Sequence, residues 1–212
     1  MRKHYLLFVL AILSAWNADA NHIIGGFISY RYISGNTYQV TMKIYRDCAA
    51  ANAAPFDGAP DDIDDQGNIN PAAIGVYELN NGIYVFDSVY GVTNPSITTL
   101  PSTSTNPCLN VPPGVCVEEG IYIFNIILPD PTKTYTICYQ RCCRNMSISN
   151  LDLPGNQGAT YSATIPPTNI YHNSSPVFNK FPPIYICVNS PLSFDNSATD
   201  INGDSLVYSL CS

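Results

Sequence analysis

The chain has 212 residues, a formal net charge of −7 and 8 cysteines. The negative charge argues against nucleic acid and anionic membrane surfaces as partners, because both are bound through clusters of Lys and Arg. The composition is rich in Tyr, Thr, Ile, Val, Pro, Asn and Gly, with few stretches suited to a helix. It predicts an all-β protein of short strands joined by turns.

The first twenty residues have the features of a secretory signal peptide. Arg2 and Lys3 make a basic start, residues 5–15 form an apolar run, and Ala18-Asp19-Ala20 fits the small-residue cleavage pattern. The apolar run is too short to span a bilayer, which takes roughly 20 residues. We therefore expect residues 1–20 to be removed, no membrane span, and a secreted or cell-surface protein.

Residues 21–167 are predicted to form one antiparallel, immunoglobulin-like β-sandwich. Alternation is clearest in one strand where Tyr38, Val40, Met42 and Ile44 would all point inward. Asn80-Asn81-Gly82 is a strong hairpin-turn signal. The expected strands are 22–34, 37–47, 74–79, 83–90, 117–128, the opening part of 135–145, and 158–165, with a Ser/Thr/Pro-rich connection over 93–107.

A long polar loop over residues 49–73 carries five aspartates and interrupts the strand pattern. A loop of this length in a compact domain is usually functional or mobile. Residues 62–67 faintly resemble a calcium loop, but Ala73 stands where such a loop needs a bidentate Glu. We expect a solvated acidic loop, with an ion site as the alternative. The aspartates are Asp57, Asp61, Asp62, Asp64 and Asp65.

Residues 168–175 are predicted to be a polar linker, and residues 176–212 the incomplete start of a second β-module. About three or four strands are expected there, fewer than the roughly seven of a sandwich, so we expect the chain to be the front end of something longer. Asp200, Asn202 and Asp204 place oxygen ligands at alternate positions around Gly203, as calcium requires. The alternative is an ordinary Asn-Gly hairpin turn.

An even number of cysteines in an exported chain favours disulfides over zinc or a catalytic thiol. We predict that Cys108 bonds to Cys116 across a Pro-Pro-Gly turn, and that Cys187 bonds to Cys211. Cys48 is expected to bond to Cys142 or Cys143. Adjacent Cys142 and Cys143 are not expected to bond each other, because the required geometry is strained. The disulfide candidates are Cys48, Cys108, Cys116, Cys142, Cys143, Cys187 and Cys211.

Several short motifs recur in one order in a known group of proteins. They include residues 22–26 (HIIGG), 44–48 (IYRDC), 115–119 (VCVEE), 139–145 (YQRCCRN), 158–165 (GATYSATI) and 198–211 (ATDINGDSLVYSLC). With these, the chain resembles the N-terminal region of large secreted PKD-domain proteins of Bacteroidota, labelled gliding-motility-associated or type IX secretion (type B sorting) proteins. The resemblance implies export, a surface location and tandem immunoglobulin-like modules that are PKD- or cadherin-like. It implies no defined activity.

No enzyme motif is present: the sequence lacks G-x-S-x-G, H-E-x-x-H and a phosphate-binding glycine loop, so we name no catalytic residue. We predict a non-enzymatic structural or adhesion protein of tandem β-modules, joined to further modules of the same polypeptide. The alternative is a module that binds an extracellular glycan or protein through the Asp-rich loop and exposed tyrosines, with an enzyme downstream. Calcium is the only cofactor that the sequence suggests.

Overall fold

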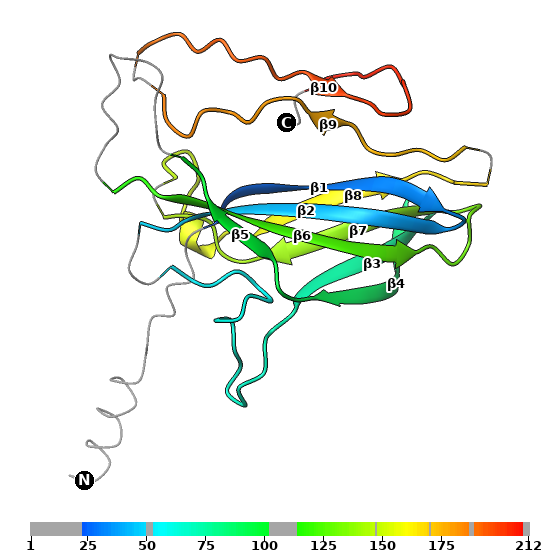
Figure 1. The fold of residues 1–212 in the computed structure, drawn as a ribbon, viewed down its shortest axis with the longest axis horizontal. Helices are drawn as coiled ribbons and strands as arrows, with labels where there is room; N and C mark the ends of the chain where they lie inside the picture. Colours follow the sequence, from blue (N-terminus) through cyan, green and yellow to red (C-terminus); the bar gives the residue numbers. More distant parts are fainter. Residues whose placement is uncertain are drawn as a thin grey trace.

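Figure 1 shows the computed structural model of the chain, which describes residues 23–49, 53–101, 114–146, 148–169, 171–186 and 189–209. The predicted signal peptide and three of the cysteines, Cys108, Cys187 and Cys211, lie outside these residues. The described residues contain strands and one short 3₁₀ turn, η1 (Pro154–Asn156), but no α-helix. The prediction of an all-β protein is confirmed.

Within the part of the chain that the structure describes, eight strands form two four-stranded antiparallel sheets. The first sheet has the order β1-β2-β6-β5, with β1 at Ile23–Ser34, β2 at Thr37–Asp47, β6 at Val117–Ile127 and β5 at Ser96–Thr99. The second has the order β4-β3-β7-β8, with β4 at Ile83–Val92, β3 at Ala72–Asn80, β7 at Thr134–Arg141 and β8 at Ala159–Ile165. The two sheets face each other across one core.

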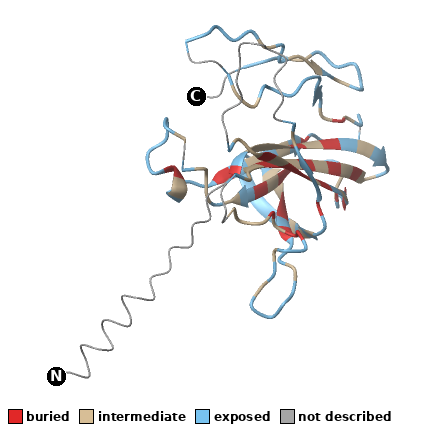
Figure 2. Cartoon of the chain, turned by 60° about the vertical axis from the view of Figure 1, so that its left-hand side comes forward, coloured by how far each residue is buried: buried red, intermediate tan, exposed pale blue. Residues whose placement is uncertain are grey.

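The core is built from the alternating inward positions of both sheets, because successive side chains on a strand point to opposite faces. The four predicted inward residues of β2 are all buried, as are Tyr122 and Ile126 of β6. The second sheet contributes Ile74, Val76, Tyr135, Ile137, Tyr139 and Ile165. Figure 2 shows the buried positions concentrated on these strands.

Strand β5 was not predicted, because its sequence lies in the stretch expected to be a Ser/Thr/Pro-rich connection. All four residues of Ser96–Thr99 are exposed, so no alternation marks them. The strand exists because it pairs with β6, with Ile97 opposite Gly120 and Thr99 opposite Glu118. Pairing with a distant strand therefore decides its structure.

The segment after β8 returns across the sandwich and then forms an open, mostly exposed extension (Figures 1 and 2). Its described strands are two-residue β9 (Val177–Phe178) and β10 (Ala198–Thr199), which pair antiparallel. The sequence suggested more strands there. The extension exposes large apolar side chains, among them Val177, Phe178, Phe181, Ile186, Leu192, Ile201 and Val207.

Among the described residues, no helix is long and apolar enough to cross a membrane.

Candidate functional site

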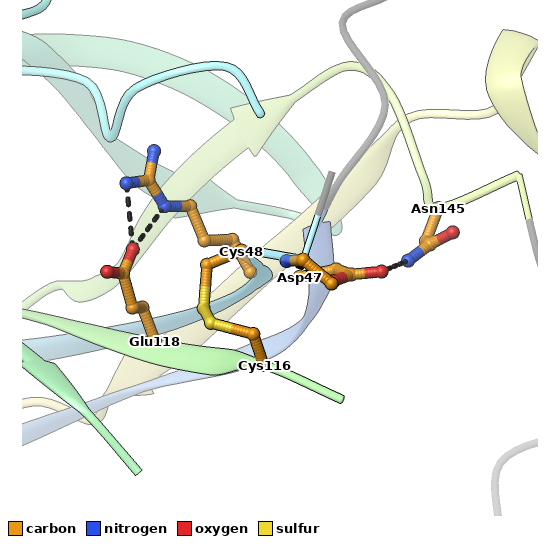
Figure 3. The surroundings of a disulfide bond; sticks show 7 residues. Asp47, Cys48, Cys116, Glu118 and Asn145 are labelled. Atoms are coloured by element: carbon orange, nitrogen blue, oxygen red, sulfur yellow. Dashed lines mark hydrogen bonds and ion pairs between the residues drawn. A yellow bond between two sulfur atoms is a disulfide. The ribbon is translucent and has the colours of Figure 1, made fainter. Parts of the chain in front are cut away.

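One disulfide of the described residues joins Cys48 to Cys116, so the partners predicted for both residues were wrong (Figure 3). β2 and β6 are neighbours, and Asp47 pairs with Val117. Cys48 follows Asp47 and Cys116 precedes Val117, so the two cysteines are the next pair along the same ladder. Their Cα atoms are 5.0 Å apart. The Cys48 amide also donates to the Cys116 carbonyl at 3.1 Å. This pairing depends on which strands are neighbours, and sequence spacing does not reveal it.

Cys142 and Cys143 bond to each other across a cis peptide, contrary to the sequence-based expectation. The cysteine-rich corner is tied to the end of β2 through a hydrogen bond instead of sulfur. Asn145 donates its side-chain amide to the Asp47 carboxylate at 2.9 Å, beside Cys48 (Figure 3). The remaining described cysteine, Cys138, is an unbonded thiol on β7.

The long acidic loop is packed against the sandwich instead of lying free in solvent. Phe56 and Ala59 are fully buried members of the core. The Phe56 ring fills the space left by Gly120 of β6, where an added Cβ would lie 2.9 Å from Phe56 Cδ1. The Arg46 guanidinium also lies over the Phe56 ring, 4.5 Å from its centroid. The expectation of a solvated loop was therefore wrong for residues 54–59.

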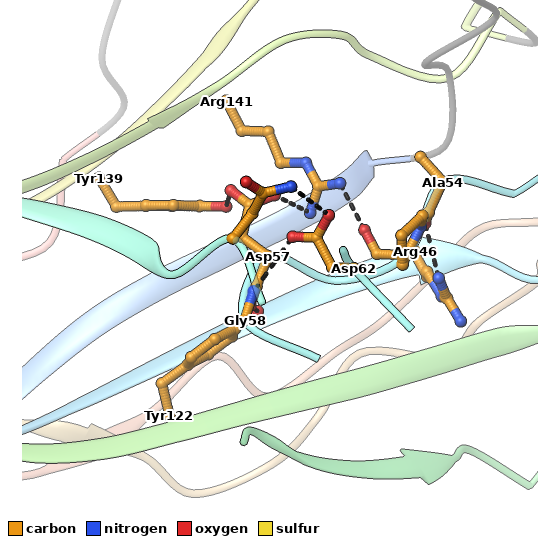
Figure 4. Close-up of polar contacts among 10 residues, drawn as sticks. Arg46, Ala54, Asp57, Gly58, Asp62, Tyr122, Tyr139 and Arg141 are labelled. Atoms are coloured by element: carbon orange, nitrogen blue, oxygen red, sulfur yellow. Dashed lines mark hydrogen bonds and ion pairs between the residues drawn. The ribbon is translucent and has the colours of Figure 1, made fainter. Parts of the chain in front are cut away.

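Asp57 faces inward and holds the loop to both sheets (Figure 4). The Tyr139 hydroxyl donates to its carboxylate at 2.6 Å, and the Arg141 guanidinium forms an ion pair with it at 3.1 Å. The Tyr122 hydroxyl from the other sheet donates to the Asp57 carbonyl at 2.8 Å. Burial, together with the Asp57 charge, raises the pKa of Tyr122 and of Tyr139 well above the ordinary tyrosine range. This aspartate is a structural anchor.

Two of the other loop aspartates are also used within the loop. The Asp62 carboxylate accepts from the Gly58 amide at 3.2 Å and from the Asn70 side chain at 3.3 Å. Asp64 accepts from the backbone amides of Gln66 and Asn68, and the Asn68 bond in particular lowers the pKa of Asp64. Asp61 and Asp65 are exposed. Within the described ranges, no three His, Cys, Asp or Glu side chains gather as metal ligands would.

The predicted calcium residues lie at the junction between the extension and the sandwich. Asp200 accepts from the backbone amides of Asn202 at 2.8 Å and Asp204 at 3.2 Å, which closes the turn locally. Asn202 accepts from the Ser174 amide at 2.8 Å, and Asp204 from the Tyr171 hydroxyl at 3.2 Å. These oxygens are directed to hydrogen-bond donors of the loop and of residues 171–174. Calcium binding stays a prediction.

The segment expected to be a linker lies along the edge strand β1. The Tyr30 amide donates to Ser175 Oγ at 2.8 Å, and the Ser175 amide donates back to the Tyr30 carbonyl at 2.9 Å. The Tyr32 amide donates to Ser174 Oγ at 3.2 Å. The His172 ring stacks on Tyr32 with centroids 4.0 Å apart. Residues 171–175 therefore satisfy backbone groups that an open sheet edge would leave to solvent.

The described surface outside the loop and the junction carries several cavities. One, of 420 Å³, lies between the start of β1 and the extension, where the Tyr45 and Phe181 rings are 5.0 Å apart. Another, of 360 Å³, is a groove on the outer face of the second sheet. It is lined by Tyr77, Tyr84, Thr136, Cys138, Gln140, Thr160 and Ser162.

The sequence indicated part of this groove without identifying it as a site. Alternation of side chains along a strand puts Thr136, Cys138 and Gln140 on one face of β7, and all three line the groove. Their neighbours Thr160 and Ser162 follow from the pairing of β7 with β8, which the sequence does not give.

Comparison of the chain with protein-family models, with curated proteins and with solved structures finds no match.

Proposed function

We propose that the chain is a non-enzymatic, secreted or cell-surface structural and adhesion protein, in which tandem β-modules keep one fixed arrangement. The observation that carries this proposal is the docking of residues 171–175 on β1. Two serine hydroxyls and one serine amide pair with backbone groups of Tyr30 and Tyr32, and Ser174 is itself buried. A free linker would leave these groups to water.

The turn at Asp200 extends the same connection into the second part of the chain. Asn202 accepts a hydrogen bond from the Ser174 amide, and Asp204 accepts one from the Tyr171 hydroxyl. The turn therefore holds the segment that pairs with the edge of β1. Signals for export and the resemblance to large secreted PKD-domain proteins support a surface location. We include in the proposal that the sandwich is immunoglobulin-like and that the extension opens a PKD- or cadherin-like module.

The test compares the full chain with the double variant Ser174→Ala/Ser175→Ala. Ser190→Ala/Ser193→Ala is the matched control, since both serines are exposed in the same part of the chain. Amide hydrogen exchange is measured at Tyr30 and Tyr32, and the radius of gyration by small-angle X-ray scattering. Losing the serine bonds, each worth about 1 kcal/mol, is expected to speed exchange about tenfold and to enlarge the molecule.

The control variant is expected to match the wild type in both measurements. Unprotected Tyr30 and Tyr32 amides in the wild-type chain would overturn the proposal, because the segment would then move independently of the sandwich.

The alternative of a recognition module is supported at a different place from the one the sequence suggested. Asp57 and Asp62 are engaged in holding the loop, which leaves Asp61 and Asp65 as its exposed carboxylates. Exposed tyrosine is present instead on the outer face of the second sheet.

A further inference from the structure

The groove on the outer face of the second sheet has an aromatic half and a polar half. β3 and β4 contribute Tyr77 and Tyr84, and β7 and β8 contribute hydroxyl, thiol and amide side chains. The inward positions of the same strands, such as Val76 and Ile137, are buried in the core. The groove is therefore built on rigid, core-anchored strands and not on loops.

The aromatic half is shaped by a glycine. A Cβ on Gly75 would lie 2.7 Å from Tyr77 Cε2 and 3.1 Å from the Tyr77 hydroxyl, so the ring lies over a position without a side chain. Phe86 of β4 packs edge-on against this ring, with centroids 5.8 Å apart and planes at 73°. Tyr84 stands beside them and is 60% exposed. The result is a supported aromatic surface that faces solvent.

The polar half presents short side chains that already have fixed neighbours. Thr136 Oγ1 lies 3.2 Å from Thr164 Oγ1, and Gln140 donates to Thr160 Oγ1 at 3.4 Å. Thr136 is buried, whereas Gln140, Thr160 and Ser162 are exposed and keep further donor and acceptor capacity toward solvent. Burial raises the pKa of the Cys138 thiol, which keeps it protonated as a small lining group.

None of the seven lining residues is charged, and the chain as a whole carries −7. An anionic ligand would therefore meet no compensating cation in the groove and an unfavourable field around it. Ligands that offer both an apolar ring face and many hydroxyl groups without charge match this lining. Pyranose rings have both properties, and tyrosine combines an apolar ring with a polar tip.

We propose that the outer face of β3, β4, β7 and β8 binds a neutral oligosaccharide. Tyr77 and Tyr84 stack on sugar rings, and Gln140, Thr160 and Ser162 bond sugar hydroxyls. This inference stands on residues other than those that carry the proposed structural function.

The experiment screens the full chain against arrayed neutral gluco-, manno-, xylo- and galacto-oligosaccharides, with uronic acid, sialylated and sulfated glycans on the same array. Hits are then titrated by calorimetry. Binding is expected among the neutral oligosaccharides only. Tyr84→Ala is expected to weaken the Kd about tenfold. Ile127→Ala is its matched control on the other sheet, since Ile127 is 66% exposed, and it is expected to leave the Kd unchanged.

Gly75→Val tests the geometry of the aromatic half, because it keeps every lining residue but displaces the Tyr77 ring. It is expected to weaken binding by a similar factor, and Tyr84→Ala keeps the proposal testable if Gly75→Val fails to fold. Thr160→Ala and its control Thr99→Ala, both at exposed threonines, test the polar half. Failure to bind any neutral oligosaccharide, or a Kd unchanged by Tyr84→Ala and Thr160→Ala, overturns the proposal.

Discussion

At the scale of single residues, Asp57 connects polar groups from both sheets. Its carboxylate receives the Tyr139 hydroxyl and pairs with Arg141, and its carbonyl receives the Tyr122 hydroxyl. Buried tyrosine hydroxyls and a mostly buried guanidinium are costly without partners. One aspartate therefore satisfies groups from both sheets. Its position near Asp61 and Asp62 in the sequence suggests surface acidity, but its role is internal.

Asp57→Ala is expected to destabilise the protein by about 2 kcal/mol, because Arg141 and Tyr139 would lose their partner in a largely buried place. The measurement is the free energy of unfolding from urea denaturation. Asp65→Ala removes an exposed carboxylate from the same loop and should change the free energy by less than about 0.5 kcal/mol. Equal, small effects of the two substitutions would show that Asp57 is not the anchor described above.

At the scale of elements, part of the loop before β3 packs into one side of the sandwich core. Phe56 inserts over Gly120, and backbone bonds such as Gly58 to Asn70 hold the loop closed. The tip of the loop, around the bridge between Ile63 and Ile69, projects away from the sheets (Figure 1). One long connection thus contains a segment that packs into the core through Phe56 and a tip that projects from the sheets.

Phe56→Ala is expected to cost about 3 kcal/mol of unfolding free energy, since it leaves a cavity between Arg46 and Gly120. Chemical denaturation of the full chain is the measurement. Phe178→Ala serves as the control, because Phe178 is 51% exposed in β9, and its effect should be small. If the loop were solvated, as the sequence suggested, both substitutions would be nearly neutral.

At the scale of the whole molecule, tyrosine supplies several of the largest buried side chains. Tyr30, Tyr45, Tyr122 and Tyr139 are all buried, and each has a raised pKa, mainly because burial disfavours the charged form. The pKa of Tyr30 is raised to about 12. The hydroxyls of three of them donate hydrogen bonds to the loop, to an edge strand and to a neighbouring carboxylate. These tyrosines therefore take part in both apolar packing and polar contacts.

This composition predicts a loss of stability in alkali. In the unfolded chain tyrosine ionises near pH 10, whereas the buried tyrosines of the folded chain stay protonated at that pH. Stability should be fully present below pH 10 and should fall as pH rises through about 10 toward 12. Urea midpoints measured across this range provide the test. Tyr30→Phe should make the decline shallower, and an unchanged midpoint up to about pH 11 would contradict the expectation.

The proposed functions occupy different parts of this molecule. The junction uses β1 and residues 171–175, whereas the glycan groove uses β3, β4, β7 and β8. Substitution of Ser174 and Ser175 is therefore expected to leave the groove intact.

The all-β architecture and most of the strands could be predicted from the amino-acid sequence alone. Tyr38, Val40, Met42 and Ile44 were predicted to point inward from their alternation, and all four are buried. This succeeded because the alternation of side chains along a strand is a local property that any core-facing strand carries. The hairpin turn at Asn81-Gly82 could be predicted for the same reason, because a few residues that are adjacent in the sequence define the turn.

Three features could be found only in the folded structure: strand β5, the partner of Cys48 and the role of Asp57. Each depends on which distant segment lies alongside: β6 for Ser96–Thr99, β6 again for Cys48, and Tyr139 with Arg141 for Asp57. The groove belongs to the same class, because its two halves come from strands that become neighbours only in the folded sheet. Local patterns specify what a segment can form, and long-range pairing specifies what it meets.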